Sequence, residues 1–113
     1  MKQASFLKDV RFADKPQIDL MLENENGKEI RICMQKGNLM AEHTAPGAIV
    51  IMVIKGSVDI GSAEGGVLLG AGEAVYFDAR VPHSLEARED SVVRLSLSKV
   101  DSIKRVEGLI FGR

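Results

Sequence analysis

The chain has 113 residues, with 15 basic and 16 acidic side chains and a formal net charge of −1. This length suits one domain with a single core. No stretch concentrates Lys or Arg, so a nucleic-acid surface, which needs positive charge to neutralise phosphates, is not expected.

The sequence also argues against a membrane or secreted protein. Its longest apolar run, residues 48–54, is far shorter than the roughly twenty residues that cross a bilayer. Residues 1–9 are interrupted by charge before a signal-peptide core could form. Cys33 is the only cysteine, which excludes an intrachain disulfide and fits a reducing compartment. We therefore expect a cytoplasmic protein.

The first half of the chain predicts an arm followed by a β-hairpin. Residues 1–16 form the expected N-terminal arm. Apolar and polar residues alternate over 18–22, which is typical of a strand with one buried face. Asn24–Gly27 supplies a hairpin turn, because Asn and Gly tolerate positive φ. The return strand over 30–34 places every second residue, all apolar, on one face.

The second half predicts several short strands. Residues 48–54 are apolar at every position, which favours a central strand covered on both faces. Such a strand in a small protein favours a homodimer, in which one sheet packs against a second copy. Residues 102–111 could form a short helix, although Gly108 weakens it. Further strands are expected at 57–60, 67–69, 74–77, 83–87 and 92–97. In all, eight to ten short strands predict an all-β antiparallel sandwich or barrel.

The two histidines of the chain lie at matched points of a repeated pattern. His43 lies between Gly37 and Gly56, and His83 follows Gly72. Each histidine comes after a glycine turn and an apolar stretch that is typical of a strand. The inner positions of a barrel strand alternate, so His43 should share its face with Ala41 and Ala45, while Glu42 points away.

These two segments resemble the paired motifs of the cupin family, in particular its small single-domain, RmlC-like members of the cupin-2 type. The resemblance implies a small antiparallel β-barrel, the jelly-roll or double-stranded β-helix. It also implies one domain over residues 1–113, with a motif core at about 30–97, an N-terminal arm at 1–16 and a C-terminal tail at 99–113.

The departures from the family pattern concern its metal site. Metal-binding cupins have a second histidine where this chain has Ala45, and a glutamate where it has Ile49. Asp78 and Arg80 replace the proline and glycine of the second motif. A stable site generally needs three or more protein ligands. Only His43 and His83 remain, so the resemblance implies an incomplete site, with either no cofactor or a divalent ion such as Zn, Fe, Mn or Ni. Other conceivable donors, which nothing places inside, are Cys33, Asp78 and Glu86.

Five further residues are candidates for a ligand pocket. Ile49, Ile51 and Val53 could line an apolar pocket, or could simply fill the core. Tyr76 and Arg80 could reach the barrel mouth and hold an anionic group, or could be solvated.

Three functions remain open at this point. The first is a barrel that binds a small organic ligand in its interior without turnover. The second is a metal-dependent enzyme, a dioxygenase or a sugar-type isomerase, that uses His43 and His83. The third is a barrel with an empty interior that serves self-association or partner binding. Fold alone does not decide among them.

Overall fold

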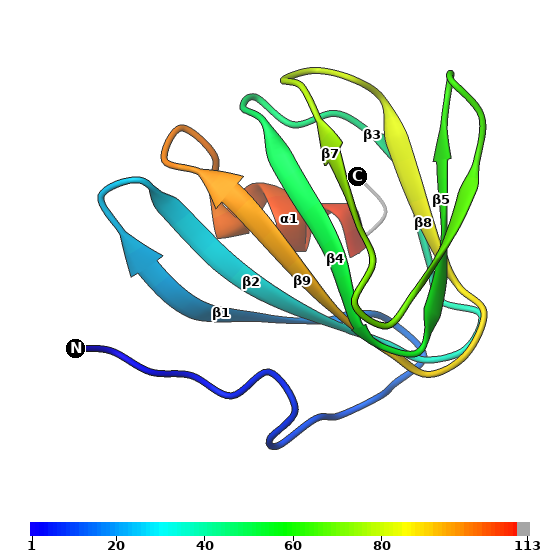
Figure 1. The fold of residues 1–113 in the computed structure, drawn as a ribbon, viewed down its shortest axis with the longest axis horizontal. Helices are drawn as coiled ribbons and strands as arrows, with labels where there is room; N and C mark the ends of the chain where they lie inside the picture. The colour runs from blue at the N-terminus through cyan, green and yellow to red at the C-terminus, as the bar shows by residue number, and fades with distance from the viewer. Residues whose placement is uncertain (111–113) are drawn as a thin grey trace.

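The computed structural model describes residues 1–110, which form nine strands and one helix (Figure 1). All strand pairs are antiparallel. This confirms the all-β antiparallel fold that the sequence predicts. The strands are β1 (Gln17–Asn24), β2 (Gly27–Met34), β3 (Leu39–His43), β4 (Ile49–Lys55), β5 (Ser57–Ser62), β6 (Val67–Gly70), β7 (Ala74–Phe77), β8 (His83–Ala87) and β9 (Ser91–Ser98), and the helix is α1 (Ile103–Ile110).

Two sheets face each other and enclose the core (Figure 1). The larger sheet has the order β1-β2-β9-β4-β7, and the smaller has the order β3-β8-β5-β6. The larger sheet contributes Ile32 and Ile51 to the core, and the smaller contributes Ile60 and Leu85, all at most 3% exposed. Burying one such side chain stabilises the fold by about 1.5–3 kcal/mol. The core is therefore aliphatic, as the low aromatic content implies.

The first hairpin forms where the turn residues predict it. β1 ends at Asn24 and β2 begins at Gly27. The Oδ1 atom of Asn24 accepts hydrogen bonds from the backbone N–H groups of Asn26 and Gly27, at 2.7 and 3.1 Å. The side chain thus satisfies backbone donors that the turn would otherwise leave free.

β4 is only partly as predicted. Ile49, Ile51 and Val53 face the core, and β4 lies between β9 and β7. The prediction that both faces of this strand are covered is wrong within one chain, because Val50 is exposed and Met52 is only half-buried. The alternation of burial shows that one face of the larger sheet looks outward. A homodimer that covers this outward face stays a prediction.

α1 spans the gap between the free edges of the two sheets. β1 and β3 are the edge strands on this side, and α1 contacts both. Val106 on α1 is completely buried in the core. The helix expected over 102–111 is found at Ile103–Ile110, one residue later than expected; residue 111 lies outside the described residues. None of the helices formed by residues 1–110 is long and apolar enough to cross a membrane.

Candidate functional site

His43 and His83 are direct partners in the β3–β8 register. Met40 pairs with Leu85 in the same ladder, so two residues of β3, Ala41 and Glu42, lie opposite the single Ser84 of β8. This irregularity shifts the alternation of β3, so that Met40 and His43 both turn inward. The expectation that Ala41 shares the inner face with His43 is therefore wrong, because Ala41 is exposed. Glu42 is exposed, as expected.

The two imidazoles lie in edge-to-face contact, with ring centroids 4.3 Å apart and planes at 70°. His83 is only 2% exposed, whereas His43 is half-buried. Phe77 stacks on His83, with centroids 4.8 Å apart and planes at 16°. The His83 ring thus contacts both an imidazole and a phenyl ring.

Backbone carbonyls fix the orientation of both rings. The Nδ1 atom of His43 lies 2.7 Å from the carbonyl oxygen of Ala41, and the Nδ1 atom of His83 lies 2.8 Å from that of Val81. A carbonyl oxygen only accepts, so each Nδ1 carries the hydrogen when the ring is neutral. Each Nε2 then presents a lone pair, and within residues 1–110 no side chain or backbone group donates to either one.

Both rings are held in the neutral form. Burial lowers the pKa of His43, and the neighbouring His83 and Arg105 lower it further, against the effect of the Ala41 carbonyl. Burial also lowers the pKa of His83, with a smaller contribution from Arg105. At pH 7 the pair therefore offers two hydrogen-bond acceptors and no charge.

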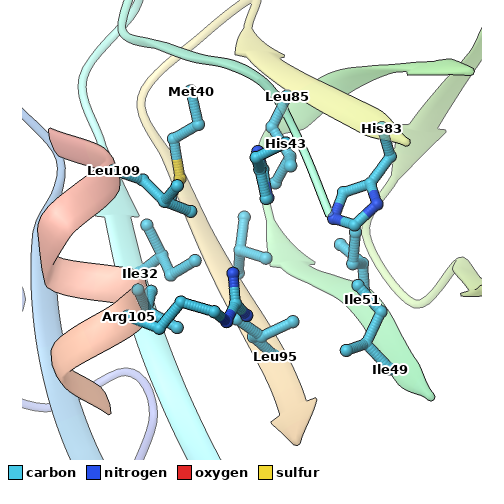
Figure 2. Close-up of a pocket in the computed structure, with 12 residues that line it drawn as sticks. Ile32, Met40, His43, Ile49, Ile51, His83, Leu85, Leu95, Arg105 and Leu109 are labelled. Atoms are coloured by element: carbon cyan, nitrogen blue, oxygen red, sulfur yellow. The ribbon is translucent and has the colours of Figure 1, made fainter. Parts of the chain in front are cut away.

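The rings line a cavity between the two sheets, which Figure 2 shows in close-up. The cavity volume is about 10 Å³, which is about the room that one water molecule needs. Apart from the histidines and Arg105, its walls are apolar. The lining residues are Ile32, Met40, His43, Ile49, Ile51, His83, Leu85, Val93, Leu95, Arg105, Val106 and Leu109.

The five predicted pocket residues fall in different places. Ile49 and Ile51 line the cavity. Val53 is buried in the core without lining it. Tyr76 is 61% exposed, and its hydroxyl donates to Asp78 at 2.8 Å. Arg80 is exposed and also lies outside the cavity.

Sequence reasoning missed Arg105, the one charged residue among residues 1–110 that lines the cavity. Its guanidinium donates to both carboxylate oxygens of Asp101, at 2.6 and 2.9 Å, and to the carbonyl oxygen of Thr44 at 3.2 Å. Figure 2 shows this side chain reaching from α1 into the cavity. Nothing in the sequence signals its role, because a lone arginine in a terminal helix is usually solvated.

The residues present do not fit the metal site that the resemblance implies. Among residues 1–110 no group of three or more His, Cys, Asp or Glu side chains could hold an ion. Cys33, Asp78 and Glu86 do not line the cavity. Two neutral imidazoles alone hold a divalent ion weakly.

Comparisons with known proteins agree with the fold. A family model described as "Cupin domain" matches residues 30–99. A search of curated proteins finds no match. A solved RmlC-like cupin from Desulfovibrio desulfuricans is 24% identical with a TM-score of 0.79, over 87% of this chain and 96% of that chain. A conserved protein of unknown function from Streptococcus pyogenes is 19% identical with a TM-score of 0.75, over 89% and 90%. KdgF from Halomonas sp. is 18% identical with a TM-score of 0.67, over 74% and 81%. At these identities the likeness concerns the fold alone.

Proposed function

The chain belongs to the cupin family, and we propose that it binds a small organic ligand inside its barrel without turning it over. The observation that carries this proposal is the pair of neutral imidazoles whose Nε2 lone pairs have no donor within residues 1–110. Neither Nε2 is among the buried side-chain atoms of residues 1–110 that lack a partner, so both lone pairs can accept a hydrogen bond from a molecule that enters the cavity. A ligand with hydroxyl or amide donors supplies that bond.

The walls of the cavity favour binding over catalysis. Ile49, Ile51 and Leu85 surround the histidines with apolar surface, which is typical of small-molecule sites with a few orienting polar groups. Among the described residues, the lining includes no serine, cysteine or carboxylate. A histidine pair alone can move a proton, but it has no nucleophile beside it.

A weakly held metal ion is the competing occupant. The hydrogen bonds from Nδ1 to backbone carbonyls leave Nε2 free, which is also the arrangement of metal-ligating histidines. This observation supports a metal-dependent enzyme as the second candidate function. The missing third donor counts against it.

The test is thermal unfolding of the purified protein against a panel of polyols, sugars and small hydroxy acids. A ligand present at 100 times its Kd stabilises the protein by about 2.7 kcal/mol, or about 10 °C in Tm for a chain of this size. We expect a member of the panel to raise Tm in the wild type and in Lys55→Ala, whose exposed residue ends β4. The rise should be lost in His43→Ala and His83→Ala.

Two outcomes would count against the proposal. One is that no compound of the panel raises the Tm of the wild type, or that a compound raises the Tm of both histidine variants as much as that of the wild type. The other is about one equivalent of a transition metal in the purified wild type that disappears in His43→Ala. The second result would favour the enzyme alternative.

A further inference from the structure

The cavity beside the histidines is closed on one side by α1. Arg105, Val106 and Leu109 come from this helix and line the cavity. Figure 2 shows Arg105 and Leu109 extending from the helix toward the space in front of the strands. The helix therefore takes up room inside the barrel that a ligand would need.

The size of the cavity makes this obstruction decisive. A volume of about 10 Å³ admits about one water molecule, whereas sites for organic ligands typically occupy about 300–1,000 Å³. The strands around the histidines are locked in hydrogen-bonded ladders, such as β4 with β9 and β3 with β8. Among the cavity walls, α1 is the one that can leave without breaking a ladder.

α1 is a weak helix by its own sequence. It has eight residues, and isolated helices shorter than about 12–15 residues are marginal in water. Gly108 lies in its interior and lowers its stability further. The helix depends on its contacts with the barrel, chiefly buried Val106 and the Arg105 side chain.

The Arg105 side chain fastens this helix to the barrel by hydrogen bonds. Its guanidinium donates to the carboxylate of Asp101, which precedes α1 and is 3% exposed. It also donates to the carbonyl oxygen of Thr44, just after β3. These bonds tie the start of the helix to the barrel, whereas the turn around Leu109 is held by apolar contact.

We propose that α1 is a lid over the histidine cavity, and that it must swing away by local unfolding before a ligand can reach His43 and His83. This inference rests on the proposed function, because a lid has a role only if a ligand enters the cavity. Local opening of this kind draws on the least stable part of a fold. Because only open molecules bind, the apparent affinity for the ligand is the intrinsic affinity multiplied by the open fraction.

The test measures access to the histidines without any ligand. Diethyl pyrocarbonate acylates neutral imidazole, and His43 and His83 are the only histidines in the chain. The rate at each site, followed by peptide mass spectrometry on the intact folded protein, reports how often the cavity opens. The two informative variants change helix propensity without altering a residue that lines the cavity.

Lys104→Gly weakens α1 at an exposed position, and we expect the buried His83 to react about fivefold faster, with a smaller increase at the half-buried His43. Gly108→Ala strengthens α1, and nothing lies within 4 Å of the added Cβ. We expect this variant to react up to about fivefold more slowly. The control is Val58→Ala, which weakens the barrel at a buried site on β5 and should leave both rates unchanged if only α1 opens.

Equal rates in wild type, Lys104→Gly and Gly108→Ala would overturn the lid. So would a rate that rises in Val58→Ala as much as in Lys104→Gly, since access would then come from global unfolding. These outcomes differ from a failure of the proposed function, in which the rates follow helix propensity but no ligand of the panel raises Tm.

Discussion

Asp19 and Arg31 face each other across β1 and β2, and their ion pair is covered by the N-terminal arm. The Nη2 atom of Arg31 lies 2.9 Å from Oδ2 of Asp19. The same guanidinium donates to the carbonyl oxygen of Lys8 at 2.7 Å and to that of Asp9 at 3.3 Å. Arg31 is only 4% exposed although it lies on the outward face of its sheet. The arm, which forms no strand (Figure 1), is thus held in part by Arg31. Arg11 of the arm also binds Asp19, and the side-chain amide of Asn38 donates to the carbonyl oxygen of Asp14.

Replacing Arg31 by Met should loosen the arm and destabilise the protein by about 2 kcal/mol, because it removes the hydrogen bonds of a buried guanidinium to Asp19 and to the carbonyl oxygens of the arm. Urea unfolding measures the loss, and limited trypsin digestion at Lys8 should become faster. The matched control is Arg11→Met. Arg11 also binds Asp19, at 2.9 Å, but its side chain is 51% exposed, so the cost should stay below about 1 kcal/mol. Equal effects of the two changes would contradict this role for Arg31.

The contribution of Asp19 should disappear in acid. Burial raises the pKa of its carboxyl, but hydrogen bonds from Arg11 and Arg31 outweigh burial, so the pKa lies below its usual range. The stabilisation is present in full above the unfolded-state pKa, about 3.9. It is lost as the pH falls through the lower folded-state pKa. Wild type should therefore exceed Asp19→Asn in unfolding free energy at pH 6, and the difference should shrink below about pH 4. A difference independent of pH would argue against the ion pair.

The two histidines should make the protein less stable between pH 7 and pH 5. Their folded-state pKa values lie below the unfolded value of about 6.5. In this window the unfolded chain therefore binds protons that the folded chain does not. The contribution of the two histidines should be constant above about pH 7, and stability should fall as the pH drops below about 6.5. In urea titrations across this range, His83→Ala should show a shallower decline than wild type. An unchanged slope would mean that His83 is not held neutral by the fold.

The fold could be predicted from the sequence because its signals are local. Alternation over 18–22, the Asn24–Gly27 turn and the glycines before each histidine each determine a short stretch, and the strands follow. The shared motif spacing then assigns how the strands assemble. Burial on β3 could not be predicted, since the extra residue between Met40 and His43 becomes visible only in the pairing with β8.

The site could be predicted only in part, for a similar reason. His43, His83, Ile49 and Ile51 lie on strands whose inner faces the motif defines, and they do meet at one cavity. Arg105 extends into the same cavity from a helix beyond the motif. Its position depends on its own hydrogen bond to Thr44 and on the packing of Val106 in the core, both of which are long-range contacts. No spacing rule carries that information.

Arg80 allows a test of what the loss of the second motif's glycine costs in stability. The family resemblance implies glycine at this position, and here the arginine has φ of 67°, in the left-handed region that favours glycine. Left-handed backbone costs a non-glycine residue about 1–2 kcal/mol, partly offset by the greater freedom that glycine has when unfolded. Arg80→Gly should therefore raise the free energy of unfolding by up to about 1 kcal/mol in urea titrations. Arg80→Val, β-branched at the same φ, should lower it. If Arg80→Gly were less stable than wild type, the arginine side chain itself would stabilise this turn.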